Sequence, residues 1–552
     1  MSEEKKLLGS EVSRRDFLRI VGAGAGAAVL AGCGTAAPTS APAAPTTAPA
    51  AAAPTVIVPK RSGELIVALG EDWQQLDPHL QSRIAAFNVH SQMYESLFKM
   101  NAKDQVEPLL AESATNIDNL TWEIKLREGI KFHNGEDFDG ESVKFSLERF
   151  YIADWVNSYK NYWPQVEIEV LDKYKVRMKT PEPWGLFLQM CTITLMVPAS
   201  AADHNADEQY WLTQPVGTGP FKLAEYEKGQ HILLEANDSY WRPDLPKVER
   251  LRYRFISEMS TRMAAVMAGE VHVADRVPPD MIKILETSAD LKMVSRATAE
   301  TQYIGFNCSR EYFKDPRVRQ AFNYAVDKKK LVNDLLLGNG MVADGCVAPP
   351  VFGYSQQTPF EQDVEKAKSL MAEAGYGSGF PDVSLIILKG VYTKALEVCE
   401  AIAGMLKEIG VNVQVEDVEP AVHWPRRRDG EFDMAFVGWA NAPCDADYTM
   451  KTFWYAGPTD QGNYQDPEGT WYLNWLRYRN PDVDVALKQG RENLDPKVRA
   501  EGYANAAKLI WPECSWLWLY FTQMIDVANK KVSGFVQTPG YTRYFEETVL
   551  SS

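Results

Sequence analysis

The order of apolar and polar residues predicts alternating strands and helices in the first third of the chain. Residues 120–126 alternate apolar with polar side chains, which is typical of a half-buried strand. Val143, Leu147 and Phe150 then recur at helical spacing. Asp139 precedes them, and its side chain suits the first position of a helix. Strand and helix patterns therefore follow one another closely.

A second pattern, later in the chain, predicts a strand–helix–strand unit. Residues 383–388 are a continuous apolar run, and residues 395–409 repeat apolar positions at helical spacing before Gly410 ends the helix. Residues 411–415 then form another strand pattern. Such units build parallel sheets, and ligands of open α/β sheets bind beyond the carboxyl ends of the strands. Residues just after these strands are therefore the first candidates for a site.

Turn residues mark three further points. Asn134-Gly135 is the strongest two-residue hairpin signal. Residues 215–221 are rich in Gly and Pro and precede new strand patterns, which predicts a domain boundary. Asp315-Pro316 has the order expected at the start of a helix, a capping residue and then proline.

Length and charge limit the class of protein. The chain has 552 residues, whereas one core typically serves roughly 100 to 200, so we expect two or three domains after residue 60. A charged content of 24% and a hydrophobic content of 45% are typical of a soluble body. The formal net charge of −16 would repel nucleic acid.

The N-terminal segment has the features of an export signal. Arg14 and Arg15 precede a short apolar run that ends at Cys33, and the segment resembles a twin-arginine lipoprotein signal. This resemblance implies that residues 1–32 are removed and that Cys33 carries a lipid. Residues 33–59 are almost wholly Ala, Pro, Thr and Ser, which cannot pack a core. We expect them to tether an extracytoplasmic body to the membrane.

Reactive residues give no sign of catalysis or metal binding. Beyond Cys33, six cysteines without a spacing pattern leave two possibilities open, one or two disulfides or isolated thiols. The seven histidines do not cluster at metal-binding intervals, so no protein metal site and no cofactor are expected. The sequence contains no GxSxG, HExxH or GxxxxGK motif. We therefore expect a protein that is not an enzyme.

A collinear series of segments resembles one family. The segments are YESLF (94–98), EPLLAES (107–113), TWEIKLREGIKFHNGEDFDGESVKFSLERF (121–150), VGTGPFKL (216–223), GFN and DPRVRQAF within 305–322, DVEKAKSLMAEAGY (363–376) and LKEIGVNV (406–413). Together they resemble the family 5 type of extracytoplasmic solute-binding proteins, which serve oligopeptide, dipeptide and nickel ABC transporters. The resemblance covers essentially residues 63 to 540.

The resemblance implies an α/β, two-lobed periplasmic-binding-protein fold with an additional third domain. Lobe I would comprise residues 60–97, 213–300 and 520–552, the extra domain residues 98–212, and lobe II residues 301–519. Such a protein is a monomeric receptor that closes around a peptide or similar polar solute and delivers it to ABC permease subunits.

The resemblance also points to ligand-binding residues near 439. Trp439 follows a buried strand and is the first candidate for stacking on a ligand. In peptide-binding relatives an Asp three residues after this Trp binds the ligand's ammonium group, but here that position is Ala442. Asp445 or Asp447 could supply the carboxylate through a shifted loop, or could simply form the turn.

Other candidates follow from neighbouring strand ends. Lys389 and Tyr392 lie after the strand 383–388, where dipeptide-binding relatives place a basic residue for the ligand carboxylate. Asp77 and His79 resemble the turn of the family's first lobe. A solvated lysine and a structural turn are the alternative interpretations of these residues.

Aromatic residues keep a second ligand class open. Seven of the fifteen tryptophans lie within eighty residues: Trp439, Trp454, Trp471, Trp475, Trp511, Trp516 and Trp518. Aromatic faces stack on sugar rings but also fill cores, so an oligosaccharide receptor of the same family is the alternative. A sensory ligand-binding subunit and a secreted hydrolase are more distant alternatives.

Overall fold

The computed structural model describes residues 60–71, 75–80, 84–152, 162–205, 207–456 and 474–551. The chain divides into an N-terminal unit, Met1–Val56, and a compact body, Ile57–Ser552. Arg14, Arg15 and Cys33 lie outside the described residues. Among the residues that are described, no helix has the length and apolar character needed to cross a membrane.

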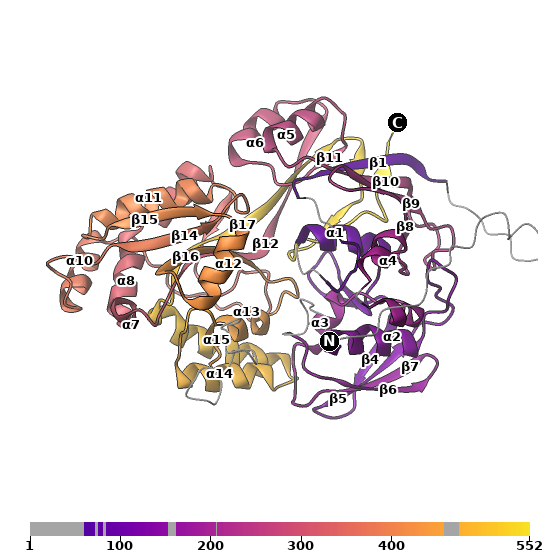
Figure 1. Ribbon diagram of the computed structural model, residues 1–552, viewed down its shortest axis with the longest axis horizontal. Coiled ribbons are helices and arrows are strands. Elements are labelled where there is room, and N and C mark those ends of the chain that lie inside the picture. The colour runs from indigo at the N-terminus through magenta and orange to yellow at the C-terminus, as the bar shows by residue number, and fades with distance from the viewer. Residues whose placement is uncertain are drawn as a thin grey trace, which may run out of the picture. The chain divides into compact units, whose positions relative to one another are not determined.

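One large sheet runs through the body (Figure 1). Its strands follow the order β15-β14-β16-β12-β17-β11-β1-β10-β9-β8, and β13 pairs with β17. The strands are β1 (Ser62–Leu69), β8 (Phe221–Glu227), β9 (His231–Ala236), β10 (Val248–Phe255), β11 (Val273–Ala274), β12 (Leu291–Phe306), β13 (Gly340–Val342), β14 (Val383–Leu388), β15 (Val413–Val418), β16 (Met434–Ala440) and β17 (Trp516–Asn529). The body is therefore an α/β protein with two groups of strands joined in the middle.

Strands β12 and β17 make that junction. They are antiparallel from Leu291↔Asn529 to Gly305↔Trp516, and both extend from one strand group to the other (Figure 1). Their register shifts between Ala297 and Thr301, so the ladder is interrupted at the centre. The interruption places Glu300 at the point where the two lobes meet.

The strand–helix–strand unit predicted in lobe II is confirmed. Strands β14 and β15 are parallel, with Val383 opposite Val413, and α11 (Ala395–Lys407) connects them. Gly410 has φ 81°, a left-handed conformation that glycine adopts without strain. The helix at Asp315-Pro316 is also confirmed as α8 (Pro316–Ala325), because Asp315 accepts a hydrogen bond from the Arg317 N–H.

A smaller sheet belongs to the segment predicted as the extra domain. Its order is β4 (Ala111–Asn116), β5 (Thr121–Leu126), β7 (Lys175–Lys179) and β6 (Glu167–Asp172), and α2 (Gly140–Glu148) and α3 (Phe187–Ile193) pack on it around their own apolar core. Asp139 caps α2 as predicted, by accepting hydrogen bonds from the N–H groups of Glu141 and Ser142. The hairpin expected at Asn134-Gly135 is reduced to a single bridge between Lys131 and Asp137.

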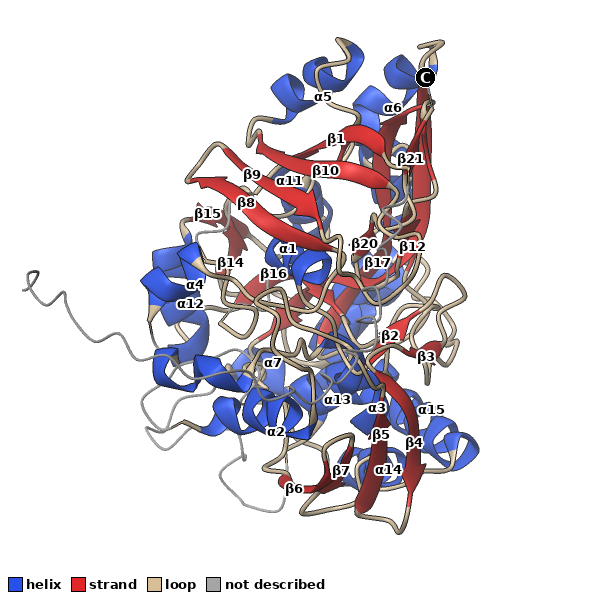
Figure 2. Ribbon diagram, turned by 90° about the vertical axis from the view of Figure 1, so that its right-hand side faces the viewer, coloured by secondary structure: helices blue, strands red, loops and turns tan. Residues whose placement is uncertain are grey.

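Helices cover both lobes, and apolar clusters lie between helices and sheet. Figure 2 shows strands β8, β9, β10 and β1 side by side, with α1 against them. The helices are α1 (Ile84–Met93), α2 (Gly140–Glu148), α3 (Phe187–Ile193), α4 (Glu208–Thr213), α5 (Met259–Met267), α6 (Pro279–Glu286), α7 (Glu311–Lys314), α9 (Lys328–Lys330), α10 (Val364–Glu373), α12 (Pro420–Asp429), α13 (Ala446–Trp454), α14 (Pro481–Arg491) and α15 (Pro496–Glu513). The smaller strands are β2 (Phe98–Met100), β3 (Val106–Pro108), β4 (Ala111–Asn116), β5 (Thr121–Leu126), β6 (Glu167–Asp172), β7 (Lys175–Lys179), β18 (Val532–Ser533), β19 (Val536–Gln537), β20 (Arg543–Tyr544) and β21 (Val549–Leu550).

Candidate functional site

Polar and aromatic side chains gather where the crossover strand β12 pairs with β16. Glu300 lies opposite Ala440, and Gln302 lies opposite Gly438. A Cβ atom on Gly438 would come within 2.3 Å of Glu300 Oε1, 2.5 Å of Gln302 Nε2 and 2.7 Å of Tyr392 Cε1. These three side chains therefore converge over the Gly438 position, which has no side chain of its own. We call Glu300, Gln302, Tyr392, Gly438 and Tyr541 the inter-lobe cluster.

Glu300 is the charged centre of this cluster. The Gln302 amide donates to its Oε1 at 2.6 Å, and Thr522 Oγ1 donates to its Oε2 at 3.4 Å. The Tyr541 hydroxyl also donates to Oε2. Burial raises the pKa of Glu300, whereas the Tyr541 hydrogen bond and the charge of Arg276 act in the opposite direction. The carboxylate is thus held in place by neighbouring side chains.

Lobe I contributes an ion pair on the same side. Arg276, which follows β11, donates from Nη1 to Glu71 Oε1 at 2.8 Å. Glu71 follows β1, and its charge helps to raise the pKa of Tyr392 of lobe II. Both members of the pair are half-buried. The strand ends of the two lobes therefore contribute charges to one region.

Tyr392 lies in the cluster, whereas the side chain of Trp439, the residue after Gly438 on β16, points to the opposite face of the strand. Trp439 is half-buried, donates from Nε1 to Thr449 Oγ1 at 3.0 Å and stacks on Tyr448 with ring centroids 5.5 Å apart. The Tyr392 hydroxyl donates to the Gly438 carbonyl at 3.4 Å. Burial raises the pKa of Tyr392 to about 12. Their contact with a ligand stays a prediction.

Lys389 has a partner on the surface instead. Its Nζ lies 2.7 Å from Glu419 Oε1, and both side chains are more than half exposed. An exposed pair of this kind contributes little to stability and leaves the lysine solvated. The geometry favours the solvated lysine over the ligand anchor that the resemblance implied.

Asp445 and Asp447 are both buried against arginines. Asp445 caps α13 and accepts from Arg499 Nη2 at 2.9 and 2.8 Å through its two oxygens. Asp447 Oδ1 lies 3.2 Å from Arg491 Nε. A buried carboxylate that is already paired would leave an unpaired arginine if it turned to a ligand. The geometry therefore favours structural roles for both residues over the ligand role expected from the sequence.

Asp77 is likewise part of a buried structural network. Arg149 Nη1 donates to Asp77 Oδ1 at 2.7 Å and to His79 Nδ1 at 3.2 Å, and His79 Nε2 donates to the Leu195 carbonyl at 2.7 Å. Burial lowers the pKa of His79 well below its usual value, so the ring is neutral. This network joins the turn after β1 to the end of α2. It favours the structural interpretation of Asp77.

Most of the tryptophan group is core. Trp454, Trp475, Trp511, Trp516 and Trp518 are each at most 5% exposed and belong to one apolar cluster. Trp471 lies outside the described residues. Core packing explains these rings, and of the described members only Trp439, next to Gly438 on β16, is half-buried.

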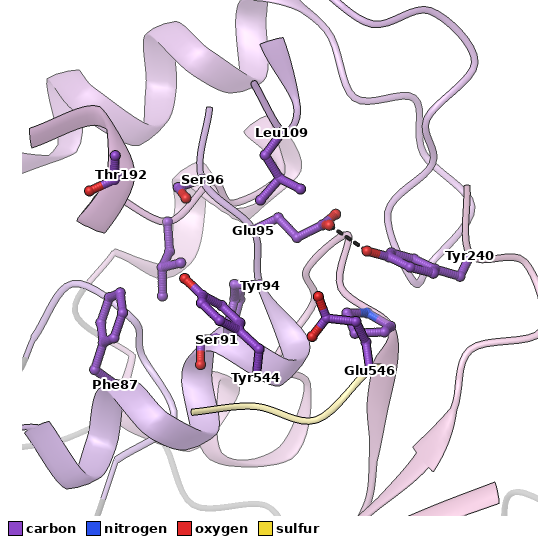
Figure 3. Close-up of a pocket in the computed structure, with 12 residues that line it drawn as sticks. Phe87, Ser91, Tyr94, Glu95, Ser96, Leu109, Thr192, Tyr240, Tyr544 and Glu546 are labelled. Atoms are coloured by element: carbon purple, nitrogen blue, oxygen red, sulfur yellow. Dashed lines mark hydrogen bonds between the residues drawn. The ribbon is translucent and has the colours of Figure 1, made fainter. Parts of the chain in front are cut away.

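A small cavity lies elsewhere in the body (Figure 3). Its volume is about 20 Å³, enough for a water molecule but not for a peptide. Glu95 lines it and accepts hydrogen bonds from Tyr240 at 2.7 Å and Trp241 at 2.9 Å. Burial raises the pKa of Glu95 to about 7. The cavity shares no residue with the inter-lobe cluster.

Within the described residues, one group of side chains on the β8–β9 hairpin could hold a metal ion. Glu225, Glu227 and His231 bring one ligand atom each within 4.8 Å of one another on the β8–β9 hairpin. His231 already forms ion pairs there, at 3.3 Å to Glu225 and 3.8 Å to Glu227. The six described cysteines are all free thiols, which decides between the two possibilities left open by the sequence.

Sequence reasoning missed Glu300, Gln302 and Tyr541. All three lie on or beside the crossover segments, whereas the sequence pattern points to the ends of the βαβ strands. Their one available signal is the break in alternation near residues 298–300, which corresponds to the register shift of β12.

Known proteins resemble the chain along most of its length. The glutathione-binding protein GsiB of Escherichia coli O1:K1 is 28% identical over 497 residues, which cover 88% of this chain and 94% of that protein. DppA from Helicobacter pylori, an ABC transporter-associated periplasmic binding protein solved with the peptide STSA, is 26% identical with a TM-score of 0.78. That match covers 89% of this chain and 99% of DppA.

A third relative binds a different compound. AgaA from A. tumefaciens R10, solved with agropinic acid, is 25% identical with a TM-score of 0.76 and covers 89% of this chain and 99% of its own. The family model for bacterial extracellular solute-binding proteins, family 5 (middle region), matches residues 105–461. With this match and the two-lobed fold, the chain belongs to the family 5 extracellular solute-binding proteins.

Proposed function

We propose that the protein is the substrate-binding receptor of an ABC importer and that it captures peptides or similarly sized polar solutes between its lobes. The observation that carries this proposal is the collinear family match together with the inter-lobe cluster, where side chains of the crossover and of lobe II converge. Relatives named for glutathione or solved with a peptide support a ligand of this class. Catalysis has no role in this proposal, because capture and release are enough.

Capture would work by population shift. A ligand that touches both lobes stabilises the closed arrangement by its differential affinity for the two states. Contacts between these parts support this proposal: Lys394, in the segment assigned to lobe II, lies 3.8 Å from Asp280, in the segment assigned to lobe I. The rings of Tyr162 and Tyr448, from the extra domain and lobe II, lie 4.7 Å apart. A permease that recognises this arrangement would receive only loaded receptors.

We also propose that Cys33 carries the lipid anchor and that Arg14 and Arg15 direct export. The composition of residues 33–59, poor in residues that build a core, supports a tether between anchor and body.

Thermal denaturation against a ligand panel tests the receptor function. The panel contains di- to hexapeptides, glutathione, oligosaccharides and nickel chelates. A ligand that binds only the folded state, at 100 times its dissociation constant, adds about 2.7 kcal/mol to the unfolding free energy. We expect peptides to raise the melting temperature. Stabilisation by oligosaccharides alone would replace the peptide assignment with the sugar one.

A further inference from the structure

We propose that Glu300 binds a protonated amine of the ligand, taking the place of the carboxylate that is missing at Ala442. This inference rests on the proposed receptor function and names the ligand class: a peptide or other solute with a free ammonium group. Glu300 reaches the site from the crossover strand β12, not from the loop after β16.

The strand register puts Glu300 beside the vacant position. Glu300 pairs with Ala440, two residues before Ala442, and the Asn441 N–H donates to the Ala299 carbonyl at 3.0 Å. The loop that carries Ala442 is therefore fixed to the strand segment that carries Glu300. The two carboxylates that the sequence offered nearby, Asp445 and Asp447, are buried against arginines.

Hydrogen bonding leaves Glu300 able to accept one more donor. A carboxylate has about four acceptor positions. Gln302 uses one on Oε1, while Tyr541 and Thr522 use two on Oε2. The remaining position is on Oε1, the oxygen that lies over Gly438.

The surroundings suit an ammonium group. Tyr392 lies against the same glycine, so an aromatic ring lies on the side of Glu300 Oε1. Aromatic faces and a carboxylate together recognise cations. Arg276, a cation that acts on Glu300, is itself paired with Glu71. A ligand ammonium would therefore supply the counter-charge that a buried carboxylate requires.

Peptide pairs that differ only at the amine test the proposal on the unaltered full chain. The probes are Ser-Thr-Ser-Ala and glutathione, each with its N-acetylated form, measured by isothermal titration calorimetry. We expect a probe with a free amine to bind at least about tenfold more tightly than its acetylated form, the scale of a lost charged hydrogen bond.

Variants then locate the effect. Glu300→Gln keeps the size of the side chain and removes its charge, and we expect it to weaken the free-amine probe about tenfold or more and to abolish the preference over the acetylated form. Glu419→Gln, at an exposed carboxylate paired with Lys389, is the matched control and should bind like the parent. If Glu300→Gln does not fold, Tyr541→Phe, which removes one donor that positions Glu300, should weaken the same preference.

The outcomes separate the two proposals. Equal affinity for free and acetylated probes overturns the role of Glu300 and leaves the receptor function standing. Binding only of solutes without an amine also overturns the role of Glu300 and leaves the receptor function standing, and it restricts the ligand class to such solutes. Failure of the whole ligand panel to bind overturns the receptor function and this inference with it.

Discussion

At the scale of residues, several buried carboxylates are paired with arginines. Asp77, Asp445 and Asp526 are each at most 1% exposed, and each is paired with an arginine from a distant segment. A buried ion pair adds little net stability, but removal of one partner is costly because the other charge stays buried. Glu300 differs, since its hydrogen-bond partners are neutral side chains.

Replacement of Asp445 tests its structural role. Asp445→Asn leaves Arg499 without its carboxylate, and we expect the unfolding free energy to fall by about 3–5 kcal/mol. Urea denaturation measures this loss. Glu419→Gln, in an exposed pair, should change the same quantity by less than about 1 kcal/mol. An Asp445→Asn protein with parental stability and lost ligand affinity would restore the ligand role predicted from the sequence.

Glu95 should give the protein a local pH dependence. Its pKa is raised from 4.5 to about 7, so between these values the folded protein holds a proton that the unfolded chain has released. The unfolding free energy therefore decreases as pH rises through this window. Glu95→Gln cannot ionise, and its stability relative to the parent should improve by up to about 3 kcal/mol from about pH 4 to about pH 8.

Denaturation curves at several pH values measure that difference. The comparison at about pH 4, where both side chains are neutral, gives the cost of the amide itself. A constant difference at all pH values would show that Glu95 ionises normally.

At the scale of elements, one glycine fixes the contact between the extra domain and lobe II. The Gly185 N–H donates to the Arg491 carbonyl at 2.8 Å, near the end of α14. A Cβ on Gly185 would come within 2.3 Å of Arg499 Nε and 2.5 Å of the Asn493 carbonyl oxygen. These elements can approach one another this closely only because residue 185 has no side chain.

Gly185→Ala should therefore destabilise the protein by about 1–3 kcal/mol, the range found for overpacked sites. Gly404→Ala is a control of opposite sign, because a Cβ there meets nothing within 4 Å and position 404 lies inside α11. We expect it to add about 0.5–1 kcal/mol. Melting temperatures of the two variants and the parent measure both changes in stability. A Gly185→Ala protein as stable as the parent would mean that the contact opens freely.

Local patterns predicted the elements better than the site. Strand β14 begins and ends at the predicted residues, because its apolar run is bounded by polar residues and turns. The Asn134-Gly135 turn forms, but Phe132 and Phe138 are drawn into the core of the extra domain, so only one bridge persists. Tyr392 and Trp439 were candidates because of their places near strand ends, and their contact with a ligand stays a prediction. Glu300 was not a candidate, since its position depends on a register shift between strands about 220 residues apart.

At the scale of the whole molecule, the chain forms two units, Met1–Val56 and Ile57–Ser552. The contact pattern divides the chain after Val56, and the segment before this point holds the predicted signal and tether. Binding should therefore not depend on the lipid, whereas location should.

Substitution of Cys33 tests this division. We expect Cys33→Ser to release the protein from the membrane fraction with its ligand affinity unchanged. Replacement of Arg14 and Arg15 by lysine should leave the chain in the cytoplasm, because the export signal is lost. Fractionation and immunoblotting measure both results. A Cys33→Ser protein that stays with the membrane would contradict the lipid anchor.

The place of β17 in the sheet has a consequence for biosynthesis. This strand, near the end of the chain, lies between β12 and β11, and the Arg543 N–H binds the Asn88 side chain at 2.8 Å. Lobe I, which emerges first from the ribosome, is thus completed by the residues that emerge last. A nascent chain that stops at residue 515 lacks the central strand that joins both lobes. Folding must then wait for the end of translation. A chain that folds after translation suits an export route that carries folded proteins, which is the route that its twin arginines predict.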